Sequence, residues 1–198
     1  MVLLLTGIIL FFGIHSLAIV ANPLRLRLKA KLGELPWKAI YSLVAIIGFA
    51  LMIKGYAVAR MDPYILYQPP GWTRHITFLL MLPVFPLALA AYFPGNIQSK
   101  LKHPMLIATK TWAFSHLLAN GTLADVLLFG CFLIWAVCDL ISLKKRTQVA
   151  MFQMPEIQVQ GKKFNDVIAV TGGLILYLVF LTWAHTFLIG MPLIRAIH

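Results

Sequence analysis

Three histidines lie inside long apolar stretches of this sequence, where an ionisable side chain is costly to place. They are His15, His116 and His185, and His103 stands just before Pro104 at the start of the stretch that contains His116. A single buried histidine is more often a hydrogen-bonded core residue than a ligand. Three in one chain favour metal chemistry, because neutral imidazole ligates haem iron and two histidines on facing helices can hold one haem.

The depth of each histidine along its stretch indicates which two can meet. At a rise of about 1.5 Å per residue, His15 lies about 15 Å from Arg25 at the inner boundary. By the same count, His116 lies about 20 Å from Lys102. His185 lies nearer the outer surface. This comparison predicts His15 and His116 as the metal ligands, with His116 and His185 as the second choice.

Two side chains close to His116 are further candidates for a cofactor site. Trp112 lies one helical turn before His116 and can stack on a ring, although packing or anchoring at the membrane interface is the alternative. Lys110 can meet a propionate or another anion, and the alternative is that it snorkels to the surface.

The elements that must position these residues are helices within a membrane. The chain has 198 residues, of which 61% are hydrophobic and 12% charged. Its apolar stretches cover residues 2–21, 39–59, 76–93, 104–119, 123–143 and 167–194. A helix needs about 20 residues to cross a bilayer, so only 104–119 is short. We predict an all-α fold, a polytopic membrane helical bundle of about six transmembrane helices, forming one domain over residues 1–198.

The basic residues predict the orientation of this bundle. The loops at 22–38, 96–103 and 144–166 hold five, two and five of the seventeen Lys and Arg residues, which is twelve in total. Placing these loops in the cytoplasm puts both termini outside. The net charge of +11 is therefore typical of loops facing anionic lipid, and we expect membrane lipid as a partner and no nucleic acid.

Several motifs, in their order and spacing, resemble the NnrU family of membrane proteins. They are His15-Ser16, His103-Pro104-Met105-Leu106, Trp112-Ala113, the run from His116 to Gly121, Leu128-Phe129-Gly130, and His185 with Leu188-Ile189-Gly190. The resemblance covers essentially the whole chain. One departure is Thr186, which follows His185 where many relatives are expected to have proline.

The resemblance implies both a cofactor and a location. The NnrU family includes bacterial proteins linked to denitrification and a membrane enzyme, the 15-cis-zeta-carotene isomerase, which uses haem b. The isomerase's two haem-ligating histidines fall on His15 and His116, and His103 would lie near the cofactor or cap a helix. The compact chain is similar to the bacterial branch, which implies the bacterial inner (plasma) membrane.

Two classes of function follow from the resemblance, and one rival class stays open. The first is a haem b protein that supports nitrogen-oxide metabolism with a redox partner. The second is an enzyme for redox-gated cis-trans isomerisation of an apolar polyene such as zeta-carotene. The rival is a non-enzymatic membrane assembly factor or small transporter without haem, whose histidines pack or relay protons. No motif predicts the oligomeric state.

Overall fold

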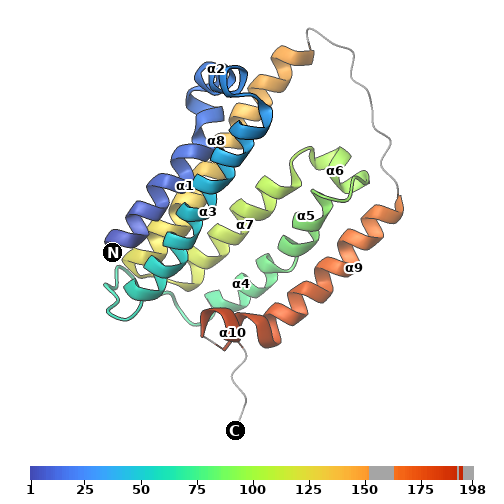
Figure 1. The fold of residues 1–198 in the computed structure, drawn as a ribbon. Coiled ribbons are helices and arrows are strands. Elements are labelled where there is room, and N and C mark those ends of the chain that lie inside the picture. Colours follow the sequence, from blue (N-terminus) through green and yellow to red (C-terminus); the bar gives the residue numbers. More distant parts are fainter. Residues whose placement is uncertain (152–162, 191, 194–198) are drawn as a thin grey trace. The chain divides into compact units, whose positions relative to one another are not determined.

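The computed structural model describes residues 1–151, 163–190 and 192–193, with the backbone alone at 147–151. Within these residues every regular element is a helix, which confirms the predicted all-α fold (Figure 1). The chain divides into two compact units. Unit 1 comprises Met1–Pro69 and Asn120–Arg146, and unit 2 comprises Pro70–Ala119 and the described part of Thr147–His198. Each unit is described by itself, and the single domain stays a prediction.

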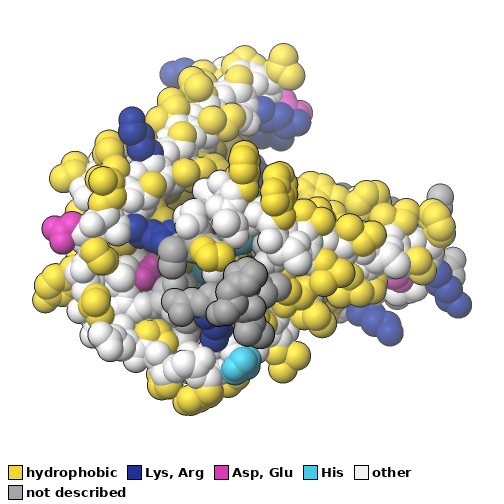
Figure 2. All heavy atoms as spheres, turned by 90° about the horizontal axis from the view of Figure 1, so that it is seen from below, with side chains coloured by type: hydrophobic (Ala, Val, Ile, Leu, Met, Phe, Trp, Pro, Cys, Tyr) yellow, Lys and Arg dark blue, Asp and Glu magenta, His cyan; other side chains and the backbone are white. Residues whose placement is uncertain are grey.

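Five segments of the described chain are long and apolar enough to cross a membrane. They are Val2–Val20, Glu34–Ala59, Thr73–Ala90, Leu123–Arg146 and Lys163–Ile189. Large apolar side chains remain on their outer surfaces, and Figure 2 shows hydrophobic side chains over much of one face. Such a surface has to be covered by lipid, so the chain is an integral membrane protein.

The remaining predicted membrane helix is α7 (Pro104–Ala119), which has the predicted bounds. Its 16 residues rise about 24 Å, less than the roughly 30 Å hydrocarbon core of a bilayer. Whether α7 crosses the membrane therefore stays a prediction.

The third predicted helix, at 76–93, is divided in the structure. It consists of α4 (Thr73–Met81) and α5 (Val84–Ala90), and Pro83 lies at the break. Proline lacks an N–H group and crowds the preceding turn. The break therefore has a local cause, and it divides the predicted segment into two helices.

Unit 1 is built on close packing between α1 (Val2–Val20) and α3 (Glu34–Ala59). A Cβ atom on Gly48 would lie 2.7 Å from the backbone nitrogen of Phe11, and one on Gly55 would lie even closer to the backbone of Leu4. Small residues let membrane helices approach in this way.

A buried apolar cluster brings α8 (Leu123–Met151) onto this helix pair. Its members include Leu4 and Met52, which are 0% and 2% exposed, and Ala124 of α8. The helix continues past the predicted end at 143, and the rest of the predicted loop lies mostly outside the described residues.

The segment 22–38, predicted as a loop, is mostly helical, so that prediction is wrong. A break at Ala21 ends α1, and α2 (Asn22–Leu32) follows at once. Pro23 lies in its first turn, where proline is tolerated because the N–H there has no helical partner. The φ angle of 87° at Gly33 then separates α2 from α3, which begins at Glu34 rather than at residue 39.

The other end of unit 1 is closed by hydrogen bonds around a buried carboxylate. Asp125 is 4% exposed and accepts a 2.5 Å bond from the Tyr56 hydroxyl. Its second oxygen accepts a 2.9 Å bond from the backbone N–H of Thr122. The Gly121 carbonyl accepts bonds of 2.8 and 3.1 Å from the N–H groups of Leu66 and Tyr67. These bonds attach the loop after α3 to the start of α8.

Unit 2 packs α5 between α7 and α9 (Lys163–Val179), with α4 against α7. The hydroxyl of Thr77 lies 3.1 Å from the Ser115 carbonyl and joins α4 to α7. The hydroxyl of Tyr177 donates a 3.1 Å bond to the Phe78 carbonyl and joins α9 to α4.

Two further features complete unit 2. Asp166 caps the short helix α6 (Asn96–Leu101) by accepting bonds of 2.9 Å from its first two N–H groups. After α9, the chain makes one π-helical turn, Phe180–Ala184, before α10 (His185–Ile189). π turns inside longer helices occur frequently at functional sites.

Candidate functional site

The ring of His15 is held in one orientation on α1. Its Nδ1 atom lies 2.7 Å from the Phe11 carbonyl oxygen, one turn earlier on the same helix. Because a carbonyl oxygen only accepts, Nδ1 carries a proton, and in the neutral ring Nε2 then carries the lone pair. The ring also stacks on Phe11, with centroids 4.1 Å apart. This tautomer is the one that can bind a metal through Nε2.

Aromatic side chains from two other helices surround the same ring. The rings of Tyr41 on α3 and Trp135 on α8 meet it edge-on, with centroids at 5.3 and 5.7 Å. The indole Nε1 of Trp135 is buried and has no hydrogen-bond acceptor among the described residues. A buried donor left without a partner is costly and is ordinarily satisfied by a water or a ligand.

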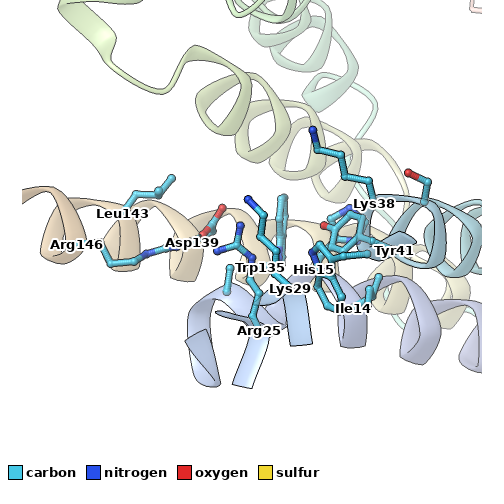
Figure 3. Close-up of a pocket in the computed structure, with 13 residues that line it drawn as sticks. Ile14, His15, Arg25, Lys29, Lys38, Tyr41, Trp135, Asp139, Leu143 and Arg146 are labelled. Carbon is cyan, nitrogen blue, oxygen red and sulfur yellow. Dashed lines mark hydrogen bonds and ion pairs between the residues drawn. The ribbon is translucent and has the colours of Figure 1, made fainter. Parts of the chain in front are cut away.

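These aromatic residues line a cavity of about 490 Å³ that lies wholly within unit 1 (Figure 3). Its walls are aromatic and apolar, and basic side chains from α2, α3 and α8 reach it. The lining residues are Ile14, His15, Ala18, Arg25, Lys29, Trp37, Lys38, Tyr41, Ser42, Trp135, Asp139, Leu143 and Arg146. The cavity therefore suits a ligand with an apolar body and an anionic part.

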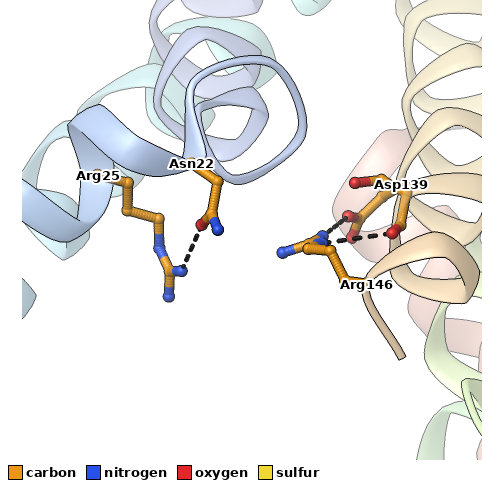
Figure 4. A network of polar contacts seen from close by, with 5 residues as sticks. Asn22, Arg25, Asp139 and Arg146 are labelled. Carbon is orange, nitrogen blue, oxygen red and sulfur yellow. Dashed lines mark hydrogen bonds and ion pairs between the residues drawn. The ribbon is translucent and has the colours of Figure 1, made fainter. Parts of the chain in front are cut away.

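The basic side chains at this cavity are only partly neutralised. Arg146 pairs with Asp139 at 3.1 Å, and Arg25 donates a 3.2 Å bond to the neutral side chain of Asn22 (Figure 4). A single carboxylate, Glu34, lies 3.8 Å from Lys29 and 2.9 Å from Lys38. Four cations and two carboxylates leave a net charge of +2 at the cavity.

The ring of His116 is held on α7 in the same way as that of His15. Its Nδ1 atom lies 2.9 Å from the carbonyl oxygen of Trp112, again one turn earlier. The Trp112 ring lies beside it, with centroids 5.1 Å apart and planes tilted by 51°. Trp112 thus contacts His116 through both its backbone and its ring. Its role at a cofactor stays a prediction.

One distance in the depth comparison of the histidines is wrong. It counted a continuous helix from His15 to Arg25, but α1 ends at Val20 and Arg25 belongs to α2. His15 lies about 8 Å before the end of its helix. His15 belongs to unit 1 and His116 to unit 2. Their pairing on one metal therefore rests on the family resemblance and stays a prediction.

The other candidate residues all belong to unit 2. Lys110 is half-buried on α7, two residues before Trp112. His103 precedes α7, and its carbonyl accepts a 3.3 Å bond from the Ile107 N–H, so its backbone begins that helix. His185 is half-buried and follows the π turn as the first residue of α10.

The sequence reasoning missed most of the residues around His15. Tyr41 and Trp135 were not considered, and Arg25 served only as a marker of depth. One available signal was the spacing of Arg25 and Lys29, which lie four residues apart and share a helix face. Trp135 and Asp139 have the same spacing on α8. The spacing shows which residues share a face of one helix. It indicates a cavity only when the helices that pack against that face are known.

No group of three or more His, Cys, Asp or Glu side chains able to hold a bare metal ion occurs among the described residues. A haem brings four nitrogen ligands of its own and takes only axial ligands from the protein, so the histidines are chemically sufficient for it.

Fold and site together define an all-α integral membrane protein with fixed histidines in its helices and a cationic aromatic cavity at one of them. A family model described as NnrU protein matches residues 3–193. The chain therefore belongs to the NnrU family. No curated protein and no solved structure matches it.

Proposed function

We propose that this NnrU-family protein binds haem b in the membrane, with His15 and His116 as axial ligands. The observation that carries the proposal is the surroundings of His15: a fixed ring whose Nε2 carries the lone pair, at an aromatic cavity with cationic side chains. Metal-binding histidines commonly donate their other N–H to a carbonyl, which fixes the ring and raises its basicity. His116 has the same arrangement.

The residues at the cavity fit the parts of a haem. The walls around Ile14, Trp37 and Tyr41 suit a flat apolar macrocycle, and the basic side chains suit its carboxylates. When bound, haem b would supply an iron centre that could exchange one electron. The protein's own residues hold and orient it. The secondary candidates for haem binding that the sequence and the family resemblance suggest are Lys110, Trp112, His103 and His185, all of which belong to unit 2.

Location and orientation are part of the same proposal. We place the protein in the bacterial inner membrane, with both termini outside. The basic helix α2 (Asn22–Leu32) supports this orientation, because Lys and Arg concentrate on the cytoplasmic side of membrane proteins.

The test is the absorption spectrum of the purified full chain in mild detergent, oxidised and reduced. We expect a six-coordinate b-type spectrum that is lost in both His15→Ala and His116→Ala. His75→Ala is the matched control, because His75 is exposed on α4 and should leave the spectrum unchanged. Protein that stays colourless after haem is added would overturn the proposal. A colourless protein that still complements a deletion strain would favour an assembly or transport role.

The reduced spectrum also separates the two reactions that the family resemblance implies. If the protein isomerises an apolar polyene at the haem, one of the two histidines would have to be able to leave the iron on reduction, and the reduced spectrum would then show loss of a histidine ligand. Six-coordination in both redox states would contradict isomerisation and favour support of nitrogen-oxide metabolism through electron exchange with a redox partner.

A further inference from the structure

We propose that Arg25 and Lys29 of α2, with Lys38 of α3, bind the two propionate carboxylates of the haem at His15. This inference rests on the haem binding proposed above and names the residues that hold the charged edge of the cofactor. Arg25, Lys29 and Lys38 line the same cavity as His15. Lys110, the propionate candidate from sequence, belongs to the other unit.

The charges at the cavity match those of the ligand. Four cations line it, namely Arg25, Lys29, Lys38 and Arg146, and the two carboxylates paired with them are Glu34 and Asp139. The difference is +2, and the two propionates of haem b carry −2. Arg146 is paired with Asp139, and Lys29 and Lys38 share one carboxylate, that of Glu34, so the positive charge that these pairs leave over lies on α2 and the start of α3.

The break at Ala21 explains how these cations reach His15. On a straight helix, Arg25 would stand about 15 Å beyond His15 along the axis. Because α1 ends at Val20, α2 begins a new helix, and Figure 3 shows Arg25 and Lys29 extending from it toward α8. The two residues are four apart, so they share one face of α2, whereas Arg27 is exposed outside the cavity lining.

Trp135 supplies a further donor at the same place. Its buried Nε1–H has no acceptor among the described residues, and its ring lies 5.7 Å from that of His15. A carboxylate near this indole would accept the missing hydrogen bond, and bonds to a charged acceptor are the stronger kind. The cavity at His15 therefore combines a net positive charge with the N–H group of Trp135, which has no acceptor among the described residues.

The test compares haem b with its dimethyl ester, which has the same macrocycle and iron but no carboxylate charge. The full chain is produced without haem, placed in discs of neutral phosphatidylcholine so that no anionic lipid competes, and titrated with each pigment. The readout is the dissociation constant from the absorption change. The variants are Arg25→Gln, Lys29→Gln and the double variant, with Arg27→Gln as the matched control on the exposed face of α2.

We expect wild-type protein to bind haem b more tightly than the ester, by about tenfold for each charge-assisted bond. Arg25→Gln and Lys29→Gln should each weaken haem binding by about tenfold and leave ester binding unchanged. Arg27→Gln should change neither. Lys38→Gln should also weaken haem binding by about tenfold and leave ester binding unchanged. Because Lys38 is on α3, this variant measures the contribution of α3 by itself.

Two results would overturn the inference in distinguishable ways. Equal binding of haem b and the ester, with both lost in His15→Ala, would show haem binding without the cationic contacts and leave the proposed function standing. Absence of binding by either pigment would remove the proposed function together with the inference. A variant that fails to fold is recognised by its circular dichroism spectrum, and Arg25→Lys then tests the position with its charge retained.

Discussion

The hydroxyl of Tyr56 on α3 donates a 2.5 Å hydrogen bond to Asp125 on α8, across 69 positions of sequence. The carboxylate is almost fully buried, and its other oxygen accepts from the backbone and side chain of Thr122. A buried carboxylate is tolerated only when its oxygens are satisfied, so Tyr56 stabilises both the end of α3 and the start of α8.

Replacing Tyr56 with Phe should destabilise the protein by about 1–3 kcal/mol, because a buried acceptor loses its donor. The measurement is the midpoint of thermal unfolding in detergent, followed by circular dichroism. The control is Tyr92→Phe, since Tyr92 is 74% exposed and should give no change. Equal midpoints for the Tyr56 variant and wild type would contradict a stabilising role for this bond.

The glycines between α1 and α3 give a second prediction. Gly55→Ala should destabilise by roughly 1–3 kcal/mol, because the added methyl group would overlap the backbone of Leu4 and separate the helices. Gly13→Ala makes the same chemical change on α1, where no atom lies within 4 Å of the new methyl group. It should be neutral or stabilise by about 0.5–1 kcal/mol through helix propensity. Similar effects at both positions would argue against close packing at Gly55.

A third prediction concerns the bond between α4 and α7. Thr77 and Thr171 each bond the carbonyl one turn earlier, but the Thr77 hydroxyl also lies 3.1 Å from the Ser115 carbonyl. Thr77→Val should therefore cost about 1 kcal/mol, and Thr171→Val, at an exposed position, should cost less than about 0.5 kcal/mol. Unfolding midpoints of the two variants make the comparison, and equal midpoints would contradict a role for the contact between the helices.

The indole of Trp135 gives a prediction about ligand binding. Trp135→Phe keeps an aromatic ring beside His15 but removes the N–H group, so haem b should bind about fivefold to tenfold more weakly. The ester of haem b should bind the variant and wild type alike. Trp72→Phe, at a 62% exposed position, is the control. Unchanged haem affinity in the Trp135 variant would mean that its N–H group has another acceptor.

The ends of a helix were predictable where residues at those ends interrupt the helix by themselves. Pro104 and the Asn120-Gly121 pair interrupt the chain on either side of α7, and the predicted bounds agree with the structure. Local chemistry also explains the break at Pro83 between α4 and α5. The prediction was wrong between Val20 and Lys38, where a basic segment was interpreted as a loop. Basic residues indicate the side of the membrane on which a segment lies, whereas helix formation depends on the helix propensity of its residues.

The surroundings of His15 were not predictable from the sequence. Trp135 lies 120 positions away from His15, and its contact depends on which faces of α1 and α8 meet. Gly48 and Gly55 allow the close approach of α1 to α3, and the buried cluster of Leu4, Met52 and Ala124 then brings α8 onto this pair. A pattern of apolar residues predicts that a helix is buried in a membrane, but it does not predict the partner of each face.

The π turn at Phe180–Ala184 sets the angular position of the residues of α10 (His185–Ile189) around the helix axis. A turn of this kind accommodates one residue more than α-helical geometry would, and each residue of an α-helix rotates the next by about 100°. His185 therefore lies on a different face, relative to Tyr177 and Gly173 of α9, from the one that uninterrupted α-helical geometry would give it. Deleting one residue of the turn would keep the helix continuous but would rotate His185 to a different face of the helix. The orientation of His185 thus depends on the number of residues in the turn rather than on which residues they are.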